Sequence, residues 1–289
     1  MHLKGGVLEH TALEEAMHHD YTSAETRRNE LIRTDLRRTF PSLGLFGDGE
    51  PLHDMLHEVL HIYCALADSL PYQQGMSHLA AILLLHLQEP QQACSGKSYK
   101  ALRASRNDLL LILVLGLYAA AMSSLLTGYP ILRAFAALHV QPAIAFFDAT
   151  LAQLLPVLDA RLKQLMVSSD MFLTPWILTM FSRSLPMSTA CRIWDRVLVD
   201  GEAELFRAAL AIMQLLQPVI LRAGFEEVVQ LLTHLPMNPV VTSDCAHNSA
   251  TTSPRHDQLA EAELLSAMTR IHLPKDLLDK LFAQSILRT

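Results

Sequence analysis

Apolar residues recur at helical spacing along almost the whole of this 289-residue chain, and this periodicity limits its possible folds more than any other feature. In the stretch PLHDMLHEVLHIYCALA, which begins at Pro51, the apolar stripe consists of Leu52, Met55, Leu56, Val59, Leu60 and Ile62. Spacings of three and four residues place such side chains on one face of an α-helix. The sequence shows no stretch with the alternating pattern of a half-buried strand. We therefore predict an all-α fold.

Composition supports a helical globular protein. Hydrophobic residues make up 51% of the chain but aromatic residues only 6%, and strand-favouring Val, Tyr and Trp are scarce beside Leu, Ala and Met. The net charge of −6 gives no general attraction to nucleic acid. The four cysteines have no paired spacing, which indicates buried thiols in a reducing compartment and neither a disulfide framework nor a Cys-based zinc site.

The periodicity predicts a single large helical domain over residues 23–289, preceded by an N-terminal helical extension over residues 1–22. In the first helix, Leu31, Ile32 and Leu36 are expected to face inward. Polar and basic stretches predict insertions near residues 95–118 and 238–256. The predicted helices cover residues 24–38, 51–67, 75–87, 141–166, 173–184, 188–199, 202–223, 260–271 and 275–287.

Two segments bear on membranes and secretion. The first twenty residues carry acids and histidines and lack the apolar core of a secretory signal. Residues 109–132 contain no charge and are long enough to cross a bilayer. Their strongly apolar part ends near Met122, and serine, threonine, glycine and proline follow, which favours a buried core helix over a membrane span.

Three separated motifs stand out, although each has an ordinary structural explanation. The first is Ile32-x-x-Asp35-x-x-Arg38 before Thr39-Phe40-Pro41, on a helix whose arginines could simply be a solvated basic face. The second is Tyr72-x-Gln74-Gly75-Met76, where the glutamine could be a helix cap or a surface residue. The third contains Trp176, Leu185-Pro186, Ile193-Trp194-Asp195, Gly201 and Leu205-Phe206-Arg207-x-Ala209-Leu210, and its tryptophans are expected in the core.

Taken together and in this order, the motifs closely resemble the TBC domain of Rab GTPase-activating proteins, over about residues 27–236. The resemblance implies a dual-finger mechanism in which Arg38 and Gln74 are supplied in trans to a Rab-type small GTPase. Asp35 is expected to orient Arg38, and Tyr72 to support the loop of Gln74. Arg33 and Arg37 receive no catalytic role and are either partner-facing or solvated.

The same resemblance implies a GTP-bound Rab partner that carries Mg²⁺ and GTP itself, so the chain would hold no cofactor. It also implies a cytoplasmic protein of vesicle trafficking, recruited to endomembranes through its partner. Two departures from the family pattern are visible. The arginine–tryptophan helix with which the family opens has no counterpart in residues 1–29, which lack tryptophan. The stretch from Ser95 to Tyr118 looks inserted, and could pack over the core, mediate association or attach to a membrane.

Two alternative functions remain. A TBC domain can also be a non-catalytic scaffold that binds a small GTPase without accelerating hydrolysis. The residues His57-Glu58-Val59-Leu60-His61 match the H-E-x-x-H pattern of zinc metalloproteases. However, Cys64 and Ala67 occupy the positions where the extended pattern has glycine and a third histidine. We therefore regard the H-E-x-x-H match as a chance one.

Overall fold

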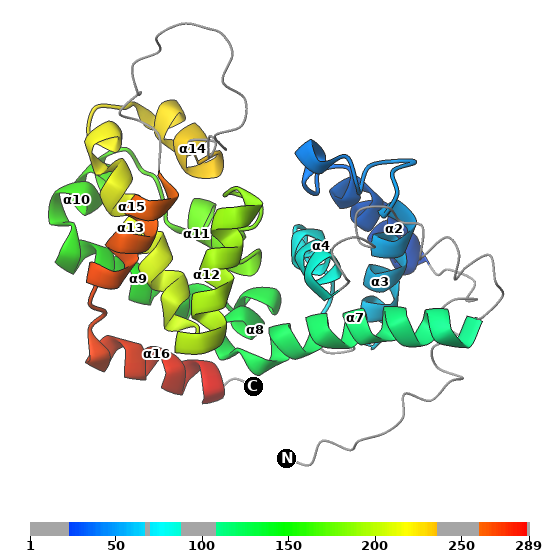
Figure 1. Cartoon of the computed structure of the whole chain (residues 1–289). Coiled ribbons are helices and arrows are strands. Elements are labelled where there is room, and N and C mark those ends of the chain that lie inside the picture. Colours follow the sequence, from blue (N-terminus) through cyan, green and yellow to red (C-terminus); the bar gives the residue numbers. More distant parts are fainter. Residues whose placement is uncertain (1–22, 67–69, 88–107, 236–259, 288–289) are drawn as a thin grey trace, which may run out of the picture. The chain divides into compact units, whose positions relative to one another are not determined.

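The computed structural model describes residues 23–66, 70–87, 108–235 and 260–287, and every regular element in these ranges is a helix (Figure 1). The all-α prediction is therefore confirmed. The predicted extension over residues 1–22, the insertion near 238–256 and the first part of the insertion near 95–118 lie outside the described ranges. The predicted division into an extension and one domain stays a prediction.

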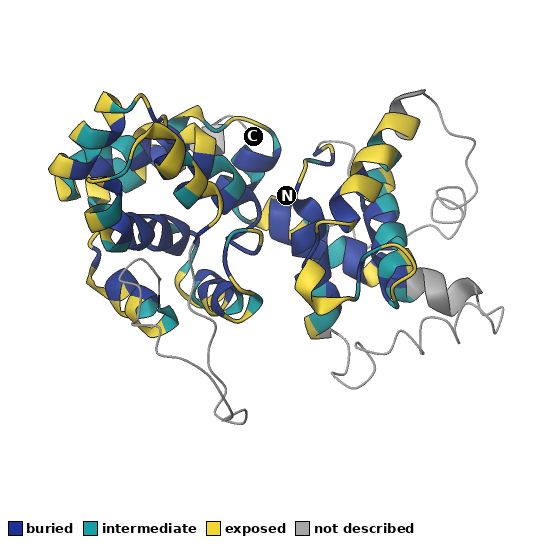
Figure 2. Cartoon of the chain, turned by 90° about the horizontal axis from the view of Figure 1, so that it is seen from above, coloured by how far each residue is buried: buried dark blue, intermediate teal, exposed yellow. Residues whose placement is uncertain are grey.

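The chain forms two compact units, residues 1–137 and residues 138–289, each with its own core. In both units the buried residues lie on the inner faces of the helices (Figure 2). The helices of the first unit are α2 (Ser23–Leu36), the short 3₁₀ helix η1 (Pro41–Leu43), α3 (His53–Leu66), α4 (Met76–Leu87), α7 (Asp108–Gly128) and α8 (Pro130–Ala136).

Helix α3 lies at the centre of the first unit and packs against α2, α4 and α7. All six residues of its predicted apolar stripe are at most 2% exposed, so that prediction is confirmed. In α2, Ile32 and Leu36 are fully buried, but Leu31 is 36% exposed and the prediction for it is wrong. Because successive residues of a helix point about 100° apart, Leu31 lies at the edge of the face that Ile32 and Leu36 bury.

Helix α7 covers the apolar segment that resembles a membrane span. Leu115, Tyr118, Ala119, Met122 and Leu126 are buried at helical spacing against α3, α4 and α8, as expected of a core helix. By length and composition, the part of α7 from residue 114 onward passes the test for a membrane span only together with α8, from which it is bent by 104°. Helix α13 (Ala203–Ile220) passes it alone, and 61% of that span is buried inside the structure.

The second unit is built around α13, which packs against α10, α11, α12 and α15. Trp176 and Trp194 lie in its core, as predicted, at 0% and 5% exposed. The indole Nε1 of Trp176 donates to the carbonyl of Leu232 at 3.0 Å, and that of Trp194 to the carbonyl of Met180 at 3.1 Å. The other helices are α9 (Gln141–Leu154), α10 (Pro156–Gln164), α11 (Asp170–Leu178), α12 (Met187–Asp200), α14 (Phe225–Thr233), α15 (Glu261–Arg270) and α16 (Lys275–Leu287).

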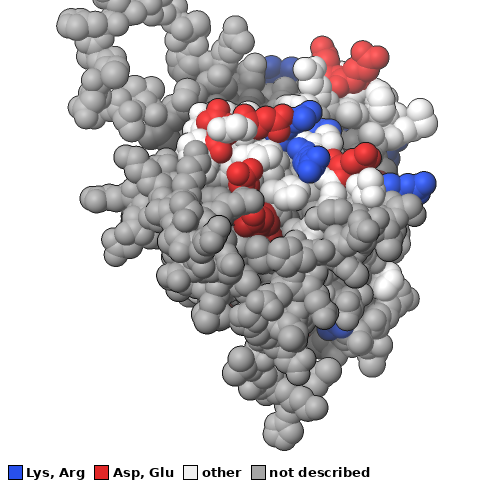
Figure 3. All heavy atoms as spheres, turned by 90° about the vertical axis from the view of Figure 1, so that its right-hand side faces the viewer, with Lys and Arg blue, Asp and Glu red and all other residues white. Residues whose placement is uncertain are grey.

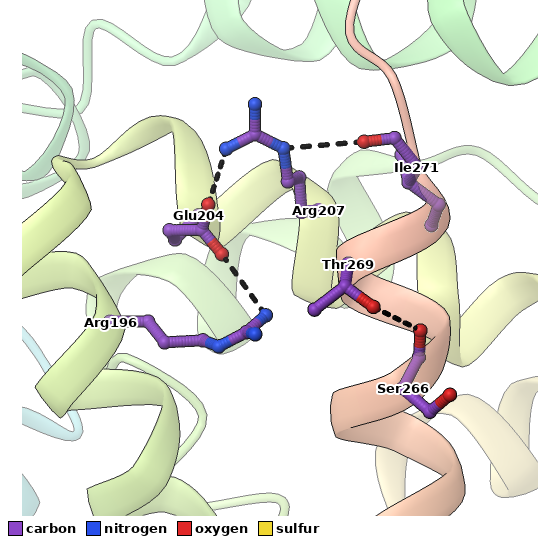
Figure 4. Close-up of polar contacts among 6 residues, drawn as sticks. All are labelled: Arg196, Glu204, Arg207, Ser266, Thr269 and Ile271. Carbon is purple, nitrogen blue, oxygen red and sulfur yellow. Dashed lines mark hydrogen bonds and ion pairs between the residues drawn. The ribbon is translucent and has the colours of Figure 1, made fainter.

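A buried carboxylate joins three segments of this unit. Glu204 of α13 is only 4% exposed and forms ion pairs with Arg196 of α12, at 3.6 Å, and with Arg207 of α13 (Figure 4). Arg207 Nε also donates to the carbonyl of Ile271, which directly follows α15, at 3.3 Å. Pairing and hydrogen bonding are what make a buried charge tolerable. The Glu204 cluster therefore ties α12 and the end of α15 to α13.

Two predictions of helix extent need correction, and two helices were missed. The helix expected over residues 141–166 is two helices, because Pro156 begins α10 and a proline is favoured at a first helical position but disrupts a helix interior. The helix expected over 173–184 ends at Leu178, because Met180 and Phe181 have left-handed backbone with φ of 45° and 64°. Helices α8 and α14 were not predicted as separate helices.

Candidate functional site

The first motif places Arg38 just beyond the end of a helix. Helix α2 ends at Leu36, and the chain then turns, with the Arg38 amide donating to the carbonyl of Asp35 at 3.0 Å. The side chain of Arg38 is exposed, whereas those of Asp35 and Thr39 on either side of it are buried. The sequence therefore anchors both flanks of this turn and leaves the guanidinium of Arg38 available to another molecule.

The residue after Thr39 has a strained backbone. Phe40 has φ of 43° and ψ of 58°, a left-handed conformation that generally costs about 1–3 kcal/mol in residues other than glycine. Its ring is 9% exposed and packs edge-on against the ring of His78 of α4, with centroids 5.2 Å apart. This contact holds the strained turn against α4.

The second motif forms the loop that enters α4. The amide of Met76 donates to the carbonyl of Gln73 at 3.1 Å, and Gly75 has φ of 98°, a conformation that favours glycine. Tyr72 and Gly75 are buried, while Gln74 between them is exposed. The loop therefore presents the Gln74 carboxamide from a fixed backbone.

Asp35 joins the two motifs. Its carboxylate is 3% exposed, and Oδ2 accepts hydrogen bonds from the Tyr72 hydroxyl at 2.8 Å and from the Gly75 amide at 2.7 Å. Tyr72 and Gly75 flank Gln74, while the backbone of Asp35 accepts from the Arg38 amide. Asp35 thus contacts the Arg38 turn through its carbonyl and the Gln74 loop through its carboxylate. The four predicted residues belong to one cluster in the first unit.

The environment of Tyr72 keeps its hydroxyl protonated. Burial raises the pKa of Tyr72 well above its ordinary value of 10, and the charge of the Asp35 carboxylate raises it further. A protonated tyrosine can donate a hydrogen bond to an ionised carboxylate, and such charge-assisted bonds are stronger than neutral ones. The Tyr72 hydroxyl therefore donates to Asp35 in the folded chain, while its support of the Gln74 loop in catalysis stays a prediction.

The sequence alone did not reveal four further residues that hold the cluster. Thr39 Oγ1 lies 2.7 Å from Ser77 Oγ, and Phe40 contacts His78, so two successive residues after Arg38 contact two successive residues of α4. Thr39 and Ser77 are 38 residues apart in sequence. Serine and threonine near helix ends usually cap the helix. The sequence offered one indication of this contact, namely that Thr39 and Ser77 each follow directly after one of the two motifs.

Arg37, in the turn that follows α2, has an acidic neighbour. Arg37 Nε lies 2.9 Å from Asp48 Oδ2, and both side chains are largely exposed. On the face drawn in Figure 3, basic and acidic side chains are interspersed among the described atoms. The side chain of Arg37 therefore has an acidic partner, whereas the exposed Arg38 side chain forms no ion pair or hydrogen bond with the described residues.

The H-E-x-x-H stretch lies inside α3, with Val59 and Leu60 buried in the core. Over the described ranges, no three His, Cys, Asp or Glu side chains lie together in a way that could hold a metal ion. A catalytic zinc ion normally has three protein ligands. The described part of the chain therefore supplies no third ligand to His57 and His61.

Comparison with known proteins identifies the class to which this fold and cluster belong. Residues 8–221 match the Rab-GTPase-TBC domain, the RabGAP-TBC family. The chain belongs to this family, which confirms the resemblance seen in the sequence motifs.

Curated relatives from animals and from Dictyostelium discoideum are similar to this chain in sequence. TBC1 domain family member 14 of Bos taurus is 39% identical over 207 residues, which are 72% of this chain and 26% of that protein. TBC1 domain family member 12 of Xenopus tropicalis is 37% identical over 72% of this chain and 27% of its own length. Drainin of Dictyostelium discoideum is 31% identical over 76% of this chain and 45% of its own length. The matched region thus spans about a quarter of the TBC1 relatives.

The structure also matches a solved one. The crystal structure of the Ypt/Rab-GAP domain of Gyp1p superimposes with a TM-score of 0.67, covering 96% of this chain and 79% of the Gyp1p chain. The sequence identity is 14%, so this likeness shows the shared fold. It confirms that the helical architecture is that of the TBC Rab-GAP type.

Proposed function

We propose that this chain accelerates GTP hydrolysis by a Rab-type small GTPase, with Arg38 and Gln74 supplied in trans. The observation that carries the proposal is the Asp35 cluster, in which one buried carboxylate anchors the backbone next to an exposed arginine and an exposed glutamine. Membership of the Rab-GTPase-TBC family supports the same activity and the same class of partner. The proposed partner is the GTP-bound GTPase.

Arg38 has the chemistry of an arginine finger. Charge develops on the phosphate oxygens as the γ-phosphoryl group is transferred, and a small GTPase alone neutralises it incompletely. A guanidinium stays charged and offers a planar fork of donors to those oxygens, and arginine fingers are worth about 10³–10⁵ in rate. In the free chain the Arg38 side chain is exposed while its backbone is fixed, so little reorganisation precedes its insertion.

Gln74 has the chemistry needed to hold the attacking water. Its carboxamide offers an acceptor oxygen and a donor nitrogen, so it can accept from the water and donate to a second group at once. The loop that carries it is fixed on both sides, by Tyr72 and Gly75 bonded to Asp35. A fixed backbone limits the orientations that the amide samples, which favours the productive one.

The proposal also covers the setting in which the reaction occurs. Mg²⁺ and GTP are carried by the partner, and this chain contributes the two side chains and the surface that positions them. The chain acts in the cytoplasm, in vesicle trafficking, and reaches endomembranes by binding its partner. Its net charge of −6 gives it no general attraction to anionic lipid, so the partner supplies the membrane attachment.

The test is phosphate release from a panel of GTP-loaded Rab proteins with and without this chain. Wild type should accelerate release by at least one of them. Arg38→Ala should lose about 10³-fold or more of the stimulated rate. Gln74→Ala should lose about 10²-fold or more, because the water loses its positioning contact. Circular dichroism should show the same helix content in both variants.

Arg37→Ala is the matched control, since it removes a neighbouring exposed arginine. It should change the rate by less than about fivefold, because exposed ion pairs such as Arg37–Asp48 are worth about 0–1 kcal/mol. Full stimulation by Arg38→Ala would overturn the finger assignment. Binding of a GTP-loaded Rab by wild type without any stimulation would instead identify a non-catalytic scaffold.

A further inference from the structure

The contacts around Thr39 point to a role beyond that of the two fingers. We propose that Thr39 is a positioning residue that locks the turn of Arg38 to the first turn of α4, and so fixes the two fingers relative to each other. The proposal rests on the proposed function for its catalytic consequence. The lock itself is a property of the free chain.

The lock is a buried hydroxyl that touches both segments. Thr39 is 1% exposed, and its Oγ1 lies 2.8 Å from the carbonyl oxygen of Asp35 and 2.7 Å from Oγ of Ser77. A hydroxyl has one proton and accepts through its lone pairs, and a carbonyl oxygen only accepts. Thr39 can satisfy both contacts at once when it donates to Asp35 and accepts from the Ser77 hydroxyl.

The Thr39–Ser77 contact lies close in sequence to both Arg38 and Gln74, so it can affect the position of each. Thr39 follows Arg38 directly, and Ser77, which is fully buried, lies three residues after Gln74. Asp35 holds the opposite side of the Arg38 turn and the flanks of Gln74. The two segments are therefore joined before Arg38 by Asp35 and after Arg38 by the Thr39–Ser77 hydrogen bond and the Phe40–His78 ring contact. A hydrogen bond is directional, whereas a ring contact tolerates sliding, so the Thr39 bond limits pivoting more than the ring contact does.

Geometry explains why the second link should affect the rate more than binding. The hydroxyl is buried, so its loss removes no contact with the partner. Pivoting of one segment moves the guanidinium relative to the carboxamide, and a misplacement of about 1 Å from a distant change can cost about 10²-fold in rate. The lock should therefore act on kcat, with KM for the GTP-loaded partner nearly unchanged.

Two substitutions at position 39 separate the hydroxyl from the shape of the side chain. Thr39→Val keeps the branched shape and removes the hydroxyl, while Thr39→Ser keeps the hydroxyl. With the Rab protein that wild type stimulates most, Thr39→Val should lower kcat by about 10–100-fold with KM within about threefold. Thr39→Ser should stay within about threefold of wild type in both constants. Thr39→Val with wild-type kcat, or equal losses in Thr39→Val and Thr39→Ser, would overturn the catalytic role.

Hydrogen exchange of the free chain tests the lock without any partner. In Thr39→Val, amides of residues 70–79 should exchange roughly tenfold faster, and those of α13 in the second unit should be unchanged. Thr39→Ser should restore the protection. Unchanged exchange in Thr39→Val would overturn the lock. If wild type stimulates no Rab protein, the proposed function fails, and the exchange result still decides the lock by itself.

Discussion

His57 of α3 lies close to the arginine-bearing helix α2 and stays neutral to a lower pH than an ordinary histidine. The pKa of His57 is lowered from 6.5 to about 4, mainly by burial and next by the positive charge of Arg33 in α2. His61 and His53 of the same helix also lower the pKa, while Asp54 raises it. His57 is therefore neutral in the folded chain at neutral and mildly acidic pH.

This charge state predicts how stability depends on pH. Between about pH 6.5 and pH 4 the unfolded chain binds a proton at His57 and the folded chain does not, so the free energy of unfolding falls as the pH falls. His57→Gln removes this titration. The loss of stability between pH 7 and pH 5, measured by urea unfolding, should be smaller in His57→Gln than in wild type. His139→Gln, which changes an exposed histidine, is the control.

The pH dependence of unfolding decides this prediction, whatever the absolute stability of the variants. Replacing His57 changes local packing, which shifts the free energy of unfolding at every pH by a similar amount. If wild type and His57→Gln lose the same stability between pH 7 and pH 5, burial does not keep His57 neutral.

Some residues of the candidate site could be predicted from the sequence and others could not. Asp35, Arg38, Tyr72 and Gln74 were found because they belong to motifs with fixed spacing. Thr39 and Ser77 were not, because their contact joins positions 38 residues apart and each residue type is common at helix ends. A long-range hydrogen bond between two small polar residues leaves no periodic trace in one chain.

At the scale of helices, the Glu204 cluster offers a test of how the second unit is held together. Glu204→Gln keeps the size of the side chain and removes its charge, which leaves Arg196 and Arg207 without their anion. The loss should destabilise the second unit by about 1–3 kcal/mol, less than for a fully buried pair because both arginines are nearly a third exposed. Hydrogen exchange should rise in α12 and α15.

A matched substitution separates the loss of the Glu204 ion pairs from the general effect of neutralising a glutamate in this unit. Glu263→Gln changes an exposed glutamate in the first turn of α15 and should cost only a few tenths of a kcal/mol. Equal stability of Glu204→Gln and wild type would show that the cluster contributes nothing to the packing of α12 and α15 on α13.

The helices themselves were largely predictable, and the misses have local causes. Strong apolar periodicity located both ends of α3, α12 and α15 to within two residues, and those of α13 to within three. The break before α10 and the early end of α11 depend on backbone conformation at Pro156, Met180 and Phe181, which periodicity does not report. Helix α14 was missed because it is only nine residues long and its docking depends on Trp176, 56 residues away from Leu232.

At the scale of the whole molecule, the first two motifs lie in one unit and the third lies in the other. The first two motifs build the Asp35 cluster in residues 1–137. The third builds the core of residues 138–289, where Trp176, Trp194 and Phe206 are buried and Gly201 ends α12 with φ of 93°. The sequence resemblance rests on all three, but only the first two motifs carry the exposed residues to which we assign chemistry.

The most direct test of the account is whether Arg38 and Gln74 act on the same step. We would measure the single-turnover rate of GTP hydrolysis by a responsive Rab protein with wild type, Arg38→Ala, Gln74→Ala and the double variant. Residues that act as a unit have strongly non-additive effects, so the double variant should be slower than Arg38→Ala by less than about tenfold. A double variant that loses the full product of the two single effects, or a single variant with the wild-type rate, would contradict the account.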